Sequence, residues 1–180
     1  MKYITLIIPV YNEQESIDSL LERLNLLDNS VSNYQFEFLF INDGSRDQTL
    51  DIITKHAQKD TRISYINLSR NFGKEIAMLA GIDHAEGDAA VIIDADLQDP
   101  PELIKEMIAY WEDGYDDVYA RRSSRQGETW LKKKTSQWYY RILQKSTSIP
   151  IQVDTGDFRL LDRRCIEALR QFRESQRNTK

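Results

Sequence analysis

The chain has 180 residues and a formal net charge of −5, with 41% hydrophobic and 29% charged residues. These values are typical of a soluble globular domain and provide enough apolar side chains for one core. The one cysteine, Cys165, cannot form an internal disulfide, and we expect it to be a small buried hydrophobe. The sequence has no apolar run of about 18 residues and its apolar start is interrupted by Pro9, which argues against a membrane span and a secretory signal.

Four short apolar runs predict the strands of a sheet. Each is rich in Ile, Val, Leu or aromatic residues and is nearly continuous rather than alternating. That pattern is typical of strands covered on both faces in a parallel sheet. The runs are Tyr3–Val10, Phe36–Asn42, Ile63–Leu68 and Ala89–Asp94.

Helical patterns lie between and after these runs. Apolar residues recur in them at helical spacing, and Pro101 stands where a helix start tolerates a missing N–H. The alternating order of strands and helices predicts a doubly wound α/β domain, whose ligands bind beyond the carboxyl ends of the strands. The predicted helices are Glu15–Leu27, Asp47–Lys59, Lys74–Ala85 and Pro101–Trp111.

The segment after the last predicted strand, DADLQD, has the most specific polar pattern. Residues two apart on an extended strand point the same way, so Asp94, Asp96 and Gln98 can share one face or one small loop. Close carboxylates repel unless a cation lies between them, and Mg²⁺ or Mn²⁺ suits oxygen ligands. The alternative is a helix N-terminal region, where acids are favoured. It explains Asp99 better than it explains three oxygen side chains on one face.

The segment NDGS after the second predicted strand is typical of a tight turn. Ser45 or Asp47 can cap the helix that follows. The Asp43 carboxylate has a second possible task, because it can accept a hydrogen bond from a nucleobase N–H.

Two other strand ends carry weaker signals. Tyr11 offers a flat face for a base and Asn12 and Glu13 offer polar edges, although Asn12 could simply begin a helix. Gly73, before a helix that carries Lys74, can hold an anion. Neither a Walker loop nor a GxGxxG dinucleotide fingerprint is present.

Two segments in the last third of the chain are also candidates. Residues 121–148 hold eight lysines and arginines against one acid, Glu128. Within them, Trp130–Ser148 can form a helix with Trp and Tyr beside basic residues, which suits a membrane surface. The alternatives are an ordinary core-packed helix and, less well supported on an acidic chain, a nucleic-acid patch. A loop is expected at Asp154–Arg159, either as part of a site or as a turn with a surface salt bridge.

Six motifs, taken in order, resemble those of family-2 glycosyltransferases with the GT-A fold, specifically the polyprenyl-phosphate glycosyltransferases. They are IIPVYNE, INDGSRDQT, LSRNFGKE, DADLQDPPE, YARRSSRQGE and DTGDFRLLDRR, and the resemblance extends from about Tyr3 to Leu169. It implies one catalytic domain over residues 1–180, with a Rossmann-like, mostly parallel sheet flanked by helices and an amphipathic interfacial helix over residues 130–148. The form of the last motif favours the undecaprenyl-phosphate glucosyltransferase branch over the dolichol-phosphate mannose synthases.

The resemblance also implies a role for each matching position. Asp157, Asp96 and Arg122 are expected to be catalytic, with Asp157 as candidate base, so that Asp157→Asn should lower turnover and nearly preserve UDP binding. Asp96 and Gln98 match metal ligands, and Arg121 and Arg122 match phosphate-binding arginines. The expected nucleotide-binding residues are Pro9, Tyr11, Asn12, Glu13, Asp43, Gly44, Ser45, Lys74, Asp94, Ala95 and Asp96.

The implied reaction is an inverting transfer of a sugar, most simply glucose, from a UDP-sugar to a polyprenyl phosphate at the cytoplasmic face of a membrane. Mg²⁺ or Mn²⁺ is the expected cofactor. The expected partners are the UDP-sugar, the lipid acceptor and the membrane surface, with a homo-oligomer as a further option and no nucleic acid. Relatives of this kind usually continue into C-terminal transmembrane helices, which this sequence does not contain, so we expect the chain itself to be soluble or peripheral.

Two other functions stay open. A non-catalytic nucleotide-sugar-binding fragment would keep the pocket without the reaction, although intact DxDxQ and GDFR loops argue against decay. A phosphohydrolase of the haloacid-dehalogenase type also has two aspartates two apart after a strand. Its acids come near the chain start, whereas the pair here follows three β-α units.

Overall fold

The structure is a computed structural model that describes residues 1–121 and 155–171, with side chains for residues 1–120 and 157–171. Residues Met1–Tyr119 and Asp157–Lys180 form one compact unit, and Ala120–Gly156 form a second. The first unit contains the site described below. The predicted interfacial helix at residues 130–148 lies outside the described residues and stays a prediction, as does the single domain over residues 1–180.

The described residues form one mixed sheet in the order β3-β2-β1-β4-β6-β5. Strand β1 pairs in parallel with β2 and β4, and β2 pairs in parallel with β3, as the continuous apolar runs predict. Strand β6 runs antiparallel to β4. The bounds are β1 Lys2–Val10, β2 Tyr34–Asn42, β3 Ile63–Asn67, β4 Ala89–Ile92, β5 Asp117–Arg121 and β6 Thr155–Asp162.

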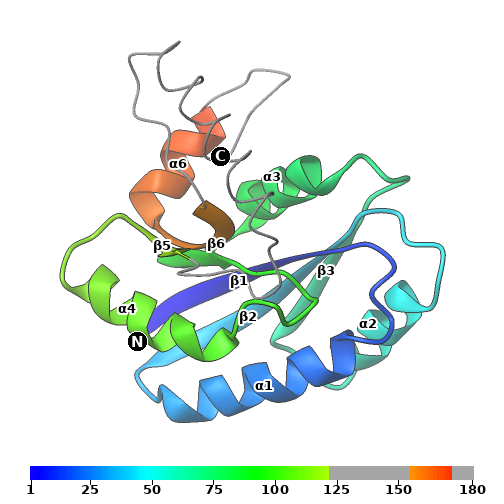
Figure 1. Ribbon diagram of the computed structural model, residues 1–180, viewed down its shortest axis with the longest axis horizontal. Coiled ribbons are helices and arrows are strands. Elements are labelled where there is room, and N and C mark those ends of the chain that lie inside the picture. Colours follow the sequence, from blue (N-terminus) through cyan, green and yellow to red (C-terminus); the bar gives the residue numbers. More distant parts are fainter. Residues whose placement is uncertain (122–154, 172–180) are drawn as a thin grey trace, which may run out of the picture. The chain divides into compact units, whose positions relative to one another are not determined.

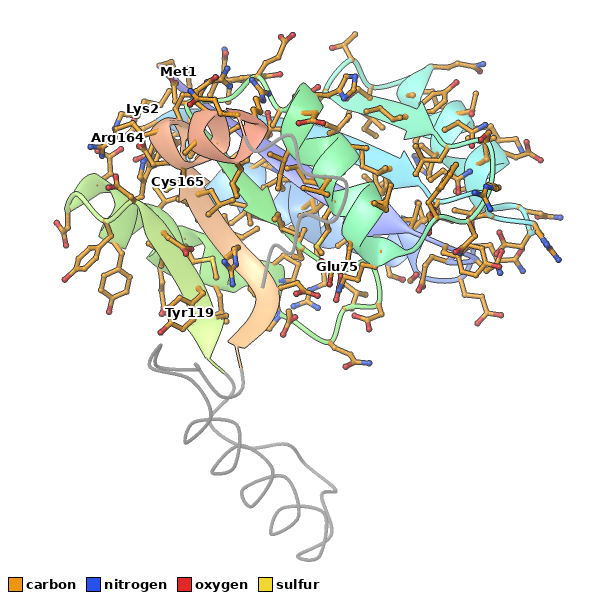
Figure 2. The ribbon with its side chains drawn as sticks, turned by 90° about the horizontal axis from the view of Figure 1, so that it is seen from above. Met1, Lys2, Glu75, Tyr119, Arg164 and Cys165 are labelled. Carbon is orange, nitrogen blue, oxygen red and sulfur yellow. The ribbon has the colours of Figure 1, made fainter. Side chains whose placement is uncertain are left out.

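Helices cover both faces of this sheet (Figure 1). Helices α3 and α6 contact each other on one face, and Figure 2 shows them in front of the strands. Helices α1 and α4 lie on the opposite face, and α2 contacts α1. The bounds are α1 Ile17–Ser30, α2 Thr49–Ala57, α3 Lys74–His84, the short 3₁₀ helix η1 Pro101–Leu103, α4 Ile104–Glu112 and α6 Arg163–Gln171.

Strand β1 is the centre of the core, and every residue from Ile4 to Val10 is buried. Helix α3 approaches it closely because Gly81 has no side chain: a Cβ at this position would overlap the side chain of Ile7 and touch that of Ile41. This close approach matters for the site, since the first residue of α3 is Lys74.

The four predicted strands and four predicted helices are all present, with ends shifted by a few residues. Strand β4 ends at Ile92, two residues earlier than predicted. The predicted loop at Asp154–Arg159 is wrong, because Thr155–Asp162 is strand β6, in which Arg159 pairs with Ile92 and Leu161 with Ala90. This pairing joins segments far apart in the chain, and β6 lacks the long apolar run that marks the inner strands.

Candidate functional site

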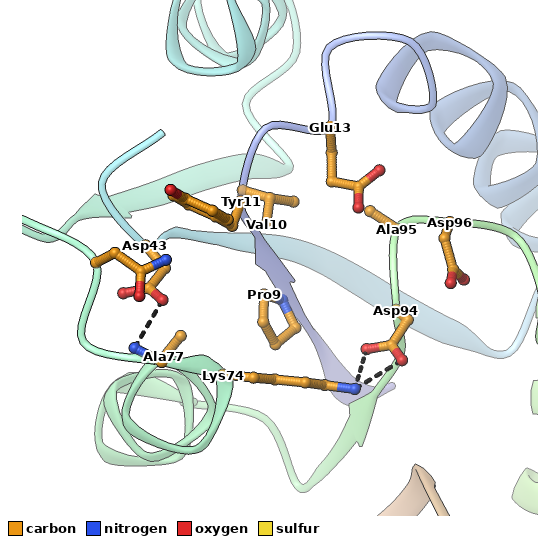
Figure 3. Close-up of a pocket in the computed structure, with 12 residues that line it drawn as sticks. Pro9, Val10, Tyr11, Glu13, Asp43, Lys74, Ala77, Asp94, Ala95 and Asp96 are labelled. Atoms are coloured by element: carbon orange, nitrogen blue, oxygen red, sulfur yellow. Dashed lines mark hydrogen bonds and ion pairs between the residues drawn. The ribbon is translucent and has the colours of Figure 1, made fainter. Parts of the chain in front are cut away.

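A pocket of about 280 Å³ opens at the carboxyl ends of β1 and β4 (Figure 3). It brings together eight of the eleven predicted nucleotide-binding residues. Asn12, Gly44 and Ser45 are not part of its wall, whereas Asn71, which was not singled out, is. The lining residues are Pro9, Val10, Tyr11, Glu13, Asp43, Asn71, Gly73, Lys74, Ala77, Asp94, Ala95 and Asp96.

Asn12 and Ser45 join the loop after β1 to the loop after β2. The Asn12 N–H donates to Ser45 Oγ at 3.0 Å, and the Arg46 N–H donates to Asn12 Oδ1 at 2.8 Å. Asn12 has a φ of 56°, which asparagine tolerates better than most residues. The Glu13 N–H in turn donates to Thr49 Oγ1 at 2.8 Å. The loop after β1 is therefore fixed to the loop after β2, and this contact holds Tyr11 and Glu13 at the pocket.

Neither predicted cap residue, Ser45 or Asp47, is the N-cap of α2, which is Gln48 and makes no side-chain cap hydrogen bond. Asp47 Oδ1 accepts the N–H of Thr49, the first residue of α2, at 3.0 Å, so Asp47 supplies the helix with an acceptor. Burial raises the pKa of Asp47, but its hydrogen bonds from Thr49 and Gln14 outweigh burial and leave the pKa below its ordinary value. Ser45 contributes to the neighbouring loop instead.

Asp43 is 3% exposed and binds the start of α3. Its Oδ1 accepts the Phe72 N–H at 2.8 Å and its Oδ2 accepts the Gly73 N–H at 2.9 Å. The sequence predicts an anion at this helix start, and the structure shows that the anion held by these two N–H groups is the chain's own carboxylate. Gly44, with a φ of 66°, allows the contact, because a Cβ there would overlap the backbone of Arg70 and Asn71.

Lys74 crosses the pocket beneath Pro9 and ends at the carboxylate of Asp94 (Figure 3). Its Nζ lies 2.6 Å from Asp94 Oδ1, 2.7 Å from Asp94 Oδ2 and 2.8 Å from Asp157 Oδ2. Asp157, the predicted base on β6, is therefore connected to the pocket wall through Lys74.

The charge of Lys74 is maintained by these carboxylates. Burial lowers its pKa, but the hydrogen bonds and charges of Asp157 and Asp94 together outweigh burial and raise the pKa above the ordinary 10.5. The group is thus an ammonium at neutral pH. The pocket wall contains this one ammonium and four carboxylates, which are Glu13, Asp43, Asp94 and Asp96.

The Asp94–Asp99 segment is a loop and not an extension of β4. Leu97 has a φ of 60°, and the Gln98 N–H turns back to donate to Asp96 Oδ1 at 3.0 Å. The Asp94 carboxylate points toward Lys74, whereas Asp96 lies farther along the loop (Figure 3). Asp96 and Gln98 are exposed. In the described part of the chain, no group of three or more His, Cys, Asp or Glu residues is placed to hold a metal ion.

A second pocket, of about 330 Å³, lies between β6, α3 and α6. Asp157, Arg159 and Asp117 give it polar groups, and Arg159 Nη1 lies 3.5 Å from Asp117 Oδ2. The remaining wall consists of Met78, Ile82, Ile92, Leu161, Cys165, Ala168 and Leu169. Cys165 is half-buried, not fully buried as expected, and burial together with the charges of Asp116, Asp117 and Asp162 raises the pKa of its thiol.

The predicted phosphate-binding arginines cannot be placed in this site. Arg121 is the last residue of β5, but its side chain is outside the described set, and Arg122 lies beyond the described residues. Across residues 1–121 and 155–171, no helix combines the length and hydropathy needed to cross a bilayer.

Fold and site together define a class: an α/β domain of the GT-A type, with an acidic pocket at the carboxyl ends of its parallel strands. The family model described as Glycosyl transferase family 2 matches residues 5–170. The chain belongs to this family, as its motifs indicate.

Individual proteins agree with this assignment. A prophage bactoprenol glucosyl transferase homolog of Escherichia coli (strain K12) is 42% identical over 167 residues, which are 93% of this chain and 54% of the relative. The chain thus spans about half the length of the curated relatives it matches.

Solved structures show the same fold. S. aureus TarS 1-349 in complex with UDP has a TM-score of 0.57 at 27% identity, over 72% of this chain and 38% of that one. The mannosyltransferase PcManGT from Pyrobaculum calidifontis, in complex with GDP-Man and Mn²⁺, has a TM-score of 0.65 at 21% identity, over 92% and 46%.

Proposed function

We propose that this protein is an inverting glycosyltransferase that moves glucose from a UDP-sugar to a polyprenyl phosphate. The observation that carries the proposal is the pocket, in which an aromatic face and a carboxylate suited to a nucleobase stand opposite two aspartates suited to a diphosphate. Glucose and the polyprenyl acceptor are supported by the 42% identical relative named a bactoprenol glucosyl transferase homolog.

The uracil would lie between the loops after β1 and β2. Tyr11 is 42% exposed and offers its ring as a stacking face. Both Asp43 oxygens already accept a backbone N–H, but a carboxylate oxygen has a second lone pair, so Asp43 can also accept the uracil N3–H. Asn71 adds an amide to the same wall.

The charge of the pocket supports a divalent cation for the diphosphate. Four carboxylates stand against one ammonium, and a diphosphate would add further negative charge, so binding without a cation is opposed by repulsion. Mg²⁺ is usually held by one or two protein carboxylates, with phosphate oxygens and water completing its shell. Asp96, in the pocket wall, and Gln98, whose N–H donates to Asp96, would supply the oxygen ligands for Mg²⁺ or Mn²⁺.

In the reaction, an acceptor phosphate oxygen forms a bond to the anomeric carbon while the bond from that carbon to the UDP oxygen breaks. The bound cation would neutralise the charge that develops on the leaving diphosphate. A phosphate monoester has a second pKa of about 6, so at neutral pH it is largely a dianion and needs little deprotonation. Asp157 would therefore orient the acceptor or steady the positive charge on the sugar ring, with Arg121 and Arg122 proposed to hold phosphate.

The setting of the reaction follows from the acceptor. A polyprenyl phosphate lies in a membrane, so we place the reaction at a membrane surface. We propose the cytoplasmic face and assign membrane contact to the segment at residues 130–148, with its Trp, Tyr and basic residues. The phosphohydrolase alternative fits less well. Asp94 would be its nucleophile, but both carboxylate oxygens of Asp94 are bound to the Lys74 ammonium.

Calorimetry with UDP tests the donor site directly. The wild-type chain should bind UDP at least about tenfold more tightly with Mn²⁺ or Mg²⁺ than without, a difference of roughly 1.4 kcal/mol. Asp96→Ala should lose this metal dependence. Glu106→Ala, which removes an exposed carboxylate on α4, is the control and should bind as the wild type does. Absence of UDP binding both with and without metal would refute the proposed function. Binding that does not depend on metal would contradict only the proposed metal cofactor.

A further inference from the structure

We propose that Lys74 is a positioning residue, whose ammonium holds Asp157 on β6 against Asp94 beside β4 and does not bind the donor phosphates. This inference rests on the proposed function, because Asp157 needs a fixed position only if it acts on the transfer. It also changes the role expected from the motif, in which Lys74 belongs to the nucleotide-binding set.

The first argument is the number of donors on the ammonium. A lysine ammonium has three N–H donors. Three carboxylate oxygens lie within hydrogen-bond distance of Lys74 Nζ, two from Asp94 and one from Asp157. A diphosphate could bind this nitrogen only by displacing one of those three carboxylate oxygens. The ammonium is therefore committed to the two aspartates before the donor arrives.

The second argument is the position of Asp157. It is absent from the wall of the first pocket, but it is part of the wall of the apolar pocket between β6, α3 and α6. Lys74 belongs to the first pocket and touches Asp157 at 2.8 Å. The ion pair thus joins the two pockets, and Asp157 reaches the donor side through Lys74.

The third argument is electrostatic. Asp94 and Asp157 both contact one nitrogen, so their carboxylates are necessarily close and would repel without the ammonium. Their side chains are 31% and 18% exposed, so solvent screens this repulsion only in part. Loss of the ammonium should move Asp157 away from Asp94. A displacement of about 1 Å in a reacting group can lower a rate on the order of 10²-fold.

Four variants test this role in assays of UDP release from UDP-glucose with undecaprenyl phosphate in detergent. Lys74→Met removes the charge and keeps the length, and Lys74→Arg keeps the charge. Asp157→Asn removes the charge on the other side of the pair. Lys105→Met, at an exposed position on α4, is the matched control and should leave activity unchanged.

The expected results separate kcat from binding. Lys74→Met should lower kcat on the order of 10²-fold, while its UDP affinity with Mn²⁺ changes by less than about tenfold. Lys74→Arg should recover part of the loss. If Lys74 acts through Asp157, then Lys74→Met combined with Asp157→Asn should be no slower than the slower single variant. If Lys74→Met does not fold, Lys74→Arg with and without Asp157→Asn provides the same comparison.

Other results would overturn the proposal. A loss confined to UDP affinity, with kcat kept, would make Lys74 a phosphate ligand. Losses in kcat that multiply in the double variant would show that the two residues act independently. If the wild-type chain binds UDP and Lys74→Met keeps full kcat, the positioning role is refuted and the proposed function is unaffected. A wild-type chain that binds no UDP would refute both.

Discussion

Asp43 shows how one side chain can serve both the fold and the site. Its carboxylate is buried after β2 and accepts two backbone N–H groups at the start of α3. Gly73 is the N-cap residue of α3 and Phe72 precedes it, so the carboxylate binds the backbone that leads into the helix. The contact fixes the loop that carries Asn71 and leads into α3 at Lys74, so the geometry of the pocket depends on a residue that binds the chain's own amides.

At the residue scale, we expect Asp43→Ala to destabilise the protein. Two backbone N–H groups would lose a charged acceptor in a buried place, which should cost roughly 2–4 kcal/mol. Urea unfolding measures the change. Glu22→Ala, at an exposed position on α1, should stay within about 0.5 kcal/mol of the wild type. Equal effects of the two substitutions would show that the Asp43 contacts contribute little.

At the scale of elements, α3 is placed by its packing on β1. The helix contacts β1, β2 and α6, and its first residue supplies the pocket with Lys74. Two arginines of α6 bind the carbonyl of Ala85, the residue that follows α3. Arg163 Nη1 donates to it at 2.8 Å and Arg170 Nη2 at 2.6 Å. These contacts connect α3 to the β6-α6 segment that carries Asp157.

Gly81→Ala tests this packing. Alanine is favoured over glycine within a helix by about 1 kcal/mol, but here its Cβ would overlap the side chain of Ile7. We expect the overlap to dominate, with a net loss of about 1–2 kcal/mol in urea unfolding. Ile7→Ala removes the overlapping methyl group, so the combined variant should lose less stability than the two single losses added together. Simple additivity would show that α3 is not in close contact with β1.

At the scale of the whole molecule, ion pairs at the surface contribute to the pH dependence of stability. The Arg62 guanidinium lowers the pKa of Asp60, Arg23 lowers that of Glu102, and Lys2 lowers that of Glu112. A carboxylate whose pKa is lower in the folded state stabilises the fold above its unfolded value and loses this effect as pH falls through the folded pKa.

We therefore expect the free energy of unfolding to decrease as pH falls below about 4.5, since the ordinary values of these groups are 3.8 and 4.5. The measurement is urea unfolding at a series of pH values from 7 to 3. Arg62→Met should reduce the slope of this decrease, because Asp60 then loses the partner that lowers its pKa. A stability that is constant down to pH 3 would contradict the expectation, as would the same slope in the variant.

The order of the first four strands and the first four helices follows from the sequence by itself. The spacing of apolar residues along the chain indicates which positions are buried in a strand or a helix. This local information was sufficient to predict β1 to β4 and α1 to α4. The apolar pattern predicts neither β5, β6 nor α6. Strand β6 forms against β4 from a segment far along the chain, so local periodicity does not reveal it. The motifs also identified most of the pocket, including Pro9, Tyr11, Glu13 and Asp96.

Only the tertiary structure decided what the site residues touch. Asn12 and Ser45 bind each other's loops, Asp43 binds the start of α3, and Lys74 joins Asp94 to Asp157. The physical reason is that hydrogen bonds and ion pairs between distant segments depend on distances that the fold alone sets. Residue types and spacing therefore determined the family and the place of the site, while the packing of α3 and β6 on the sheet determined how its charges are paired.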